Sequence, residues 1–176
     1  MDEEILECLA SSSNEFKANQ KTISTQLGPK QNLLLQSFNF HAALEELTDW
    51  FLLLLKNEPP PKTLAAINFG LFETKEGCQL YVTGALKYDE DDPDWACAND
   101  WWPEGRYAPS NELCLIWERF ENAGTKSWTV VQSIVIVLLK EILKSRTSEI
   151  RKISRLKGVH IFTGFDDGDL FKIGNL

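Results

Sequence analysis

Residues 40–61 constrain the fold more than any other part of the chain. Asn39 precedes them as a potential N-terminal cap, and Pro59-Pro60-Pro61 ends the stretch. Between these two signals, apolar residues recur with the alternating spacing of four and three that marks one face of an α-helix, at Phe40, Leu44, Leu47, Phe51 and Leu54. The pattern predicts an amphipathic helix over residues 40–57. A helix with one broad apolar face needs a second layer to pack against.

A β-hairpin is predicted directly after the prolines. Residues 64–73 and 78–88 are rich in strand-forming types, and the short turn 74–77 between them contains Gly77. Side chains alternate across a strand, so one face of the hairpin is expected to carry Ile67, Phe69, Leu71, Leu80, Val82 and Leu86. That apolar face can supply the second layer.

The remaining segments complete a predicted α+β domain. Residues 111–123 fit a helix ended by Gly124, although 113–117 also fit a strand; we favour the helix. Residues 128–143 predict a long buried helix, and residues 159–165 and 170–173 predict two strands joined by Asp166-Asp167-Gly168-Asp169. We therefore expect a single domain over residues 1–176. It should have a mostly antiparallel sheet packed by two or more amphipathic helices, among them 40–57 and 128–144.

The N-terminal segment, residues 1–36, carries weaker signals. Residues 3–18 are compatible with a short amphipathic helix that the tract Ser11-Ser12-Ser13-Asn14 weakens. Residues 17–36 are polar and contain Gly28-Pro29, which predicts a connector. We expect this segment to be loosely attached to the domain.

Residues 87–107, called the acidic-aromatic segment below, are the most informative stretch for function. They combine seven carboxylates with five large aromatic rings, and Pro93, Pro103 and Gly105 interrupt the stretch. Because Trp is costly to leave in water and carboxylates are costly to bury, the segment is expected to lie along the surface with its acids outward. Such a surface suits recognition. Two plainer alternatives are a solvated acidic face and Trp rings that cap the hairpin core.

Charge indicates what this surface would bind. The segment supplies five of the eight net negative charges of the chain. A concentrated negative surface attracts basic proteins and repels phosphate backbones, so nucleic acid is disfavoured as a partner. The residues that we predict to contact a partner are Asp89, Glu90, Asp91, Asp92, Asp94, Trp95, Asp100, Trp101, Trp102 and Glu104. The basic stretch 146–157 is expected to pair with this acidic segment or to face water.

Signatures of catalysis and of cofactor binding are weak. The four cysteines form no Cys-x-x-Cys pair, and the clusters 89–94 and 166–169 do not match a calcium-binding loop. Neither His41 nor His160 can be tied to a nucleophile by its spacing. We therefore expect no cofactor, metal or catalytic residue. The open alternative is a carboxylate-dependent hydrolase or metal-binding enzyme that uses the acidic clusters.

Cellular location follows from further absences. The first residues lack the basic and then apolar pattern of a secretion signal, and the longest apolar runs fall far short of the roughly 20 residues that span a bilayer. Four reduced thiols would suit the cytosol, whereas an even count would also permit two disulfides in an oxidising compartment. These observations predict a cytoplasmic protein without a membrane partner.

Two segments carry a resemblance to a known class of proteins. Residues 88–97 with 102–107, and residues 164–170, resemble small bacterial proteins of unassigned function that look like immunity proteins of polymorphic or contact-dependent toxin systems. The resemblance implies a cytoplasmic, acidic, single-domain inhibitor that binds a cognate toxin domain, often a basic nuclease. Toxin-contacting residues cannot be transferred, because they vary between pairs. Together with the charge, it predicts a non-enzymatic binding protein, most specifically an immunity protein.

Overall fold

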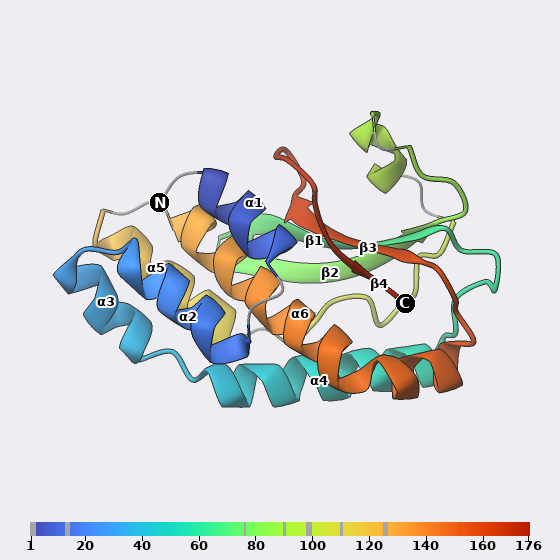
Figure 1. Ribbon diagram of the computed structural model, residues 1–176. Helices are drawn as coiled ribbons and strands as arrows, with labels where there is room; N and C mark the ends of the chain where they lie inside the picture. The colour runs from blue at the N-terminus through green and yellow to red at the C-terminus, as the bar shows by residue number, and fades with distance from the viewer. Residues whose placement is uncertain are drawn as a thin grey trace.

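A four-stranded mixed sheet, covered on one face by helices, forms the centre of the computed structural model (Figure 1). The structure describes residues 3–12, 15–75, 77–89, 91–97, 100–109, 111–124 and 127–176. In chain order, the elements are α1 (Glu3–Ser11), α2 (Phe16–Thr25), α3 (Pro29–Gln36), α4 (Phe40–Asn57), β1 (Ala66–Thr74), β2 (Gly77–Ala85), the 3₁₀ helix η1 (Pro93–Cys97), α5 (Asn111–Asn122), α6 (Ser127–Ser154), β3 (His160–Phe165) and β4 (Phe171–Asn175).

The strands lie in the order β2-β1-β3-β4. The β1–β2 hairpin and the β3–β4 pair are antiparallel, whereas β1 and β3 are parallel, so most of the sheet is antiparallel as predicted. A parallel pair needs a long crossover connection, which the chain between β2 and β3 provides with α5 and α6. The α+β class is confirmed.

Helix α4 matches its prediction from cap to stop. The Asn39 side chain accepts a hydrogen bond from the Ala42 backbone N–H at 3.1 Å, and the helix ends at Asn57, two residues before Pro59. Its buried face meets the hairpin at Phe51 and Phe69, whose ring centroids are 5.0 Å apart. The apolar core therefore lies between the helices and the face of the sheet that carries Phe69.

The hairpin and the C-terminal helices are mostly as predicted. Strand β2 ends at Ala85, so Leu86 lies beyond it and is 41% exposed, which corrects its assignment to the buried face. Residues 111–122 form the favoured helix, α5. Helix α6 runs on through Ser154, further than predicted, and takes in most of the basic stretch. Arg151 and Lys152 on this extension are exposed, so these side chains face water.

The predicted connector at residues 17–36 is wrong, because α2 and α3 occupy most of it. The predicted helix 3–18 is also two helices, with α1 ending at Ser11. Pro29 stands in the first turn of α3, where its missing N–H costs nothing, so Gly28-Pro29 starts a helix instead of marking a loop. Helices α1 and α2 pack on α6, and Leu6, Leu9 and Ile23 are buried there. The N-terminal segment thus contributes to the core.

Candidate functional site

The acidic-aromatic segment covers two parts of the sheet that the helices leave free. Its first half, including η1, lies over the face opposite α4 and α6, here called the open face, and stands out from the body of the molecule in Figure 1. Its second half runs along β2, one of the two edge strands of the sheet. The segment therefore reaches from the middle of the sheet to its edge.

Backbone hydrogen bonds hold the second half against β2. Gly84 and Trp101 exchange two N–H···O bonds of 3.0 Å, and the Val82 N–H donates to the Arg106 carbonyl at 3.0 Å. These bonds cover much of a strand edge that would otherwise offer unpaired backbone groups to other chains. Because successive residues of an extended chain point to opposite faces, Trp101 is directed to the core and Trp102 to the open face.

Trp101 is a core residue. Its ring is 6% exposed, and its Nε1 donates to the Glu58 carbonyl at 3.1 Å. The Glu58 carboxylate in turn accepts the backbone N–H groups of Glu104 and Gly105, at 2.6 and 2.9 Å. The end of α4 thereby anchors the segment. A partner could not reach the Trp101 ring, which corrects its prediction as a contact residue.

Trp102 remains available at the surface. Its ring and that of Tyr107 are both 46% exposed, and the Arg106 guanidinium lies 4.2 Å from the Trp102 ring centroid and 4.6 Å from that of Tyr107. Trp95 is half-buried and packs on Phe162 of β3, with ring centroids 4.8 Å apart. Of the three predicted Trp contacts, Trp102 is thus the most accessible and Trp95 is partly covered.

The acidic side chains point outward as expected. Asp89, Asp91, Asp92, Asp94, Asp100 and Glu104 are all exposed, and Glu90 lies outside the described residues. Some of these acids also order the loop: Asp100 accepts the Leu86 N–H at 2.8 Å, and Asp92 accepts the Asp94 N–H at 3.0 Å. The ion pairs between described residues, His41–Glu45 and Arg146–Glu149, do not involve them.

A cavity of about 360 Å³, called the sheet-face pocket, lies beneath η1 on the open face. Its walls come from η1, from Trp102, and from the β3–β4 turn, residues 166–170. The acidic-aromatic segment and the β3–β4 turn, far apart in the sequence, therefore meet at one cavity. Its charged lining residues among those described are the carboxylates Asp94 and Asp166, with no Lys, Arg or His.

Two glycines shape this pocket. A Cβ on Gly70 would lie 2.2 Å from Cζ of Tyr81, its neighbour across the β1–β2 pair. A Cβ on Gly164 would lie 2.4 Å from the Asp169 carbonyl oxygen. Gly70 and Gly164 are themselves partners across β1 and β3. Their missing side chains let the Tyr81 ring and the β3–β4 turn lie close to the sheet.

Tyr81 and Asn68 supply polar groups to the pocket. The Tyr81 hydroxyl donates to the Asp166 carboxylate, and burial, together with this hydrogen bond and the negative charge, raises the pKa of Tyr81 above its ordinary value. Asn68 is 4% exposed, and its Oδ1 has no hydrogen-bond partner among the described residues. A buried acceptor without a partner costs about 1–3 kcal/mol, so a ligand that donates a hydrogen bond there is favoured.

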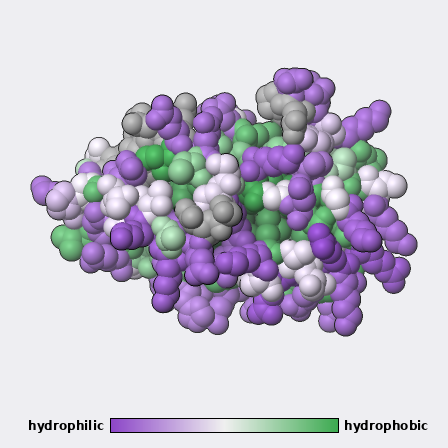
Figure 2. Space-filling model, in the orientation of Figure 1, coloured by the Kyte–Doolittle hydropathy of each residue, from purple (hydrophilic) through white to green (hydrophobic). Residues whose placement is uncertain are grey.

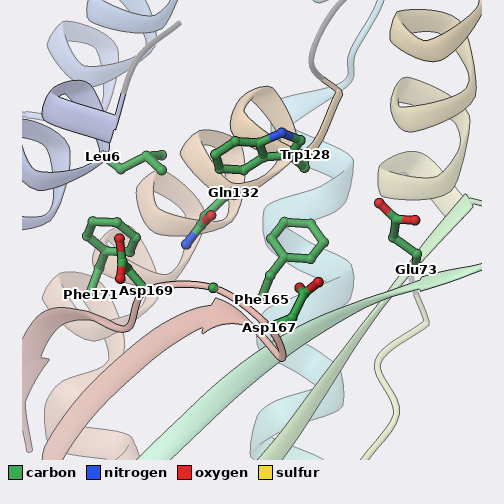
Figure 3. Close-up of a pocket in the computed structure, with 9 residues that line it drawn as sticks. Leu6, Glu73, Trp128, Gln132, Phe165, Asp167, Asp169 and Phe171 are labelled. Atoms are coloured by element: carbon green, nitrogen blue, oxygen red, sulfur yellow. The ribbon is translucent and has the colours of Figure 1, made fainter. Parts of the chain in front are cut away.

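A larger cavity of about 590 Å³, called the edge pocket, lies on the other side of the β3–β4 turn (Figure 3). Leu6 from α1, Trp128 and Gln132 from α6, and Phe165 and Phe171 from the strands form its walls. Three carboxylates also line it, those of Glu73, Asp167 and Asp169, again without a described basic side chain. The β3–β4 turn thus separates two acidic pockets.

Within the described ranges, no three His, Cys, Asp or Glu side chains gather as a metal site requires. His41 is on the exposed face of α4, and His160 packs against Tyr88 with the two rings tilted and their centroids 4.5 Å apart. No helix within the described ranges has both the length and the apolar composition needed to cross a membrane.

Asn68 and Tyr81 were not predicted from the sequence as site residues, and Asp166 was predicted only as part of a turn and of the acidic cluster 166–169 in the enzyme alternative. Asn68 and Tyr81 sit inside strands, where no local pattern distinguishes them from ordinary open-face residues. Gly70 and Gly164 were the available signal, since glycine within a strand often marks a close approach of other groups.

Among known proteins, no family model, no curated protein and no solved structure matches this chain.

Proposed function

We propose that this chain is a non-enzymatic binding protein that recognises a basic protein partner through the acidic-aromatic segment and the sheet-face pocket. In its most specific form, it is an immunity protein that neutralises a cognate bacterial toxin. The support for the toxin is the resemblance of residues 88–97, 102–107 and 164–170, which line or flank the same pocket.

The chemistry of the sheet-face pocket carries the proposal. Its charged groups are carboxylates, and its unpartnered buried atom, Asn68 Oδ1, is an acceptor. A Lys or Arg side chain brings hydrogen-bond donors and a positive charge, which match both features. The rings of Tyr81 and Trp102 line the same cavity and can contact the stem or the cation of such a side chain.

The exposed carboxylates around the pocket have a second role in this proposal. They raise the rate of encounter with a basic protein through long-range attraction, while an accessible aromatic anchor such as Trp102 slows dissociation once the complex has formed. The internal contact between Arg106 and Trp102 shows that this ring accommodates a guanidinium group. Charge and anchor thus make separate, measurable contributions.

Affinity capture from the source organism identifies the partner, and the product of the adjacent gene is the first candidate. We expect one stoichiometric basic protein, whose expression alone arrests growth and whose toxicity is relieved when this chain is co-expressed. Capture of no such protein by the folded chain, or a captured protein that is harmless, would remove the immunity function.

Binding kinetics then test the surface itself. The double variant Asp91→Asn/Asp92→Asn should associate roughly 3–10-fold more slowly at low salt, with the difference vanishing at high salt. Its matched control is Asp49→Asn/Glu118→Gln, which removes the same charge from exposed sites on α4 and α5 and should change association little. Trp102→Ala should mainly raise the dissociation rate. If both double variants and Trp102→Ala bound the partner with the association and dissociation rates of the wild type, the contact would lie elsewhere.

A further inference from the structure

The edge pocket contains a buried polar group that the fold leaves unused. Gln132 of α6 is 2% exposed, and its Nε2 has no hydrogen-bond partner among the described residues. Figure 3 shows its amide directed into the pocket, between Phe165 and Phe171. A buried donor without an acceptor destabilises the fold, and a bound acceptor recovers that cost.

The carboxylates of the pocket lie at two places along it. In Figure 3, Asp169 is beside Phe171, whereas Asp167 and Glu73 lie beyond Phe165 on the opposite side of Gln132. All three acids are exposed, and the ion pairs between described residues do not include them. A positive group is therefore favoured on either side of the Gln132 amide.

Apolar surface fills the space between the acids. Trp128 and Phe165 meet edge to face with ring centroids 6.4 Å apart, and Leu6 and Phe171 add further apolar walls. Figure 2 shows apolar residues at the surface between α1 and the β3–β4 turn, bordered by hydrophilic ones. An aliphatic stem fits this floor, because burying apolar surface away from water is favourable.

We propose that the edge pocket binds an Arg or Lys residue within an extended peptide segment of a protein partner. A peptide carbonyl accepts from Gln132 Nε2, the side-chain cation pairs with Asp167 or Asp169, and the stem packs on Trp128 and Phe165. The inference extends the proposed function, since it gives the basic partner a second contact on the far side of the β3–β4 turn. A simple amine would bind more weakly because it lacks the carbonyl that accepts from Gln132, and an apolar peptide would bind more weakly because it lacks the positive charge.

Three small probes separate these contributions in calorimetric titrations of the full chain. N-acetyl-arginine N-methylamide carries both carbonyl and cation, n-butylguanidine carries only the cation, and N-acetyl-norleucine N-methylamide carries only the carbonyl. We expect the arginine probe to bind about 3–10-fold more tightly than n-butylguanidine, as one net hydrogen bond allows, and more tightly still than the norleucine probe. A five-residue peptide with a central Arg should bind at least as well, which would distinguish a peptide ligand from a free amino acid derivative.

Variants assign the binding to this pocket. Gln132→Leu should reduce the affinity for the arginine probe to that for n-butylguanidine, and leave the affinity for n-butylguanidine unchanged. Asp167→Asn should weaken both cationic probes about 3–10-fold, whereas its charge-matched control Asp49→Asn on α4 should not. Urea unfolding checks the fold, and Gln132→Leu should be at least as stable as the wild type because an unpaired buried amide is replaced by an apolar group.

Several outcomes would overturn the inference. These are absence of binding by any probe to the folded chain, equal affinity for the arginine and norleucine probes, or an undiminished preference for the arginine probe in Gln132→Leu. The result is separable from the proposed function. Asp91→Asn/Asp92→Asn should lose association rate with the partner while keeping its affinity for the probes, so either proposal can fail while the other holds.

Discussion

Gly70→Ala tests whether the hollow of the sheet-face pocket depends on a missing side chain. A Cβ at residue 70 would lie 2.2 Å from Cζ and 2.4 Å from the hydroxyl oxygen of Tyr81. Comfortable contacts between carbon atoms are about 3.5–4.0 Å, so the ring has to move by roughly 1 Å or more. A displacement of that size breaks the hydrogen bond between Tyr81 and Asp166.

The expected magnitude follows from two opposing effects. A net hydrogen bond to a charged acceptor contributes about 1.5–3 kcal/mol, while replacing a strand glycine by alanine recovers about 0.5–1 kcal/mol of backbone entropy. We expect Gly70→Ala to lower the free energy of unfolding by roughly 1–2 kcal/mol. In a Tyr81→Ala background the clash is absent, so the same substitution should become neutral or stabilising by about 0.5–1 kcal/mol.

Urea unfolding of the wild type, the two single variants and the double variant measures this change of sign. Gly168→Ala is the control, since its Cβ would meet the Phe165 Cβ at 3.5 Å, an ordinary contact, and it should cost about 0.5 kcal/mol or less. If Gly70→Ala had the same effect with and without the Tyr81 ring, the steric argument for the pocket would be refuted.

Three further measurements test other parts of the structure. Tyr81 should ionise at higher pH than free tyrosine in an absorbance titration, and Asp166→Asn should lower the pKa of Tyr81. Because the raised pKa keeps the proton on the folded chain, the free energy of unfolding should fall as pH rises above about 10, and it should fall less in Tyr81→Phe. Lys140 donates to the backbone carbonyls of Leu9 and Ala10 at the end of α1, at 2.7 and 2.6 Å, so Lys140→Met should cost about 1–3 kcal/mol in thermal or urea unfolding. Burial lowers the pKa of Lys140, so between that pKa and about 10.4 the unfolded chain binds more protons than the folded chain. The Lys140 contribution to the free energy of unfolding therefore rises with pH in this range, and Lys140→Met should lack this rise. Trp101→Phe should lose roughly 2–3 kcal/mol because Trp101 is buried and bonded to Glu58, whereas Trp102→Ala should lose about 1 kcal/mol or less; similar losses would contradict their placement.

Local periodicity explains which elements could be predicted. Helix α4, the β1–β2 hairpin and the terminal strands carry apolar patterns with clear caps, turns or stops, and their positions match the structure closely. Helices α2 and α3 lack such patterns: both are short and mostly polar, with Asn19, Ile23 and Leu35 as their buried residues. Short helices gain most of their stability from tertiary packing, and the sequence of the segment alone does not contain that term.

The candidate site divides in the same way. Outward acids and a surface-bound segment follow from the mixture of carboxylates and aromatic rings, and the structure agrees at the described residues. The burial of Trp101 and the exposure of Trp102 do not follow from that mixture. The two residues are adjacent and of the same type, and only the pairing of this segment with the edge of β2 makes one buried and the other exposed. One ring became core and the other surface through a register that no composition argument can supply.

The sequence by itself determined the fold class, the main helices and strands, and the outward-facing acids of the acidic-aromatic segment, because these properties depend on neighbouring residues. Only the tertiary structure decided the two pockets. The parallel pairing of β1 with β3 sets Gly70 beside Gly164, more than 90 positions later in the sequence, and brings the β3–β4 turn beneath η1. Contacts over such distances depend on how whole elements pack, so Asn68, Tyr81 and Gln132 emerge as candidate binding residues only in the folded chain.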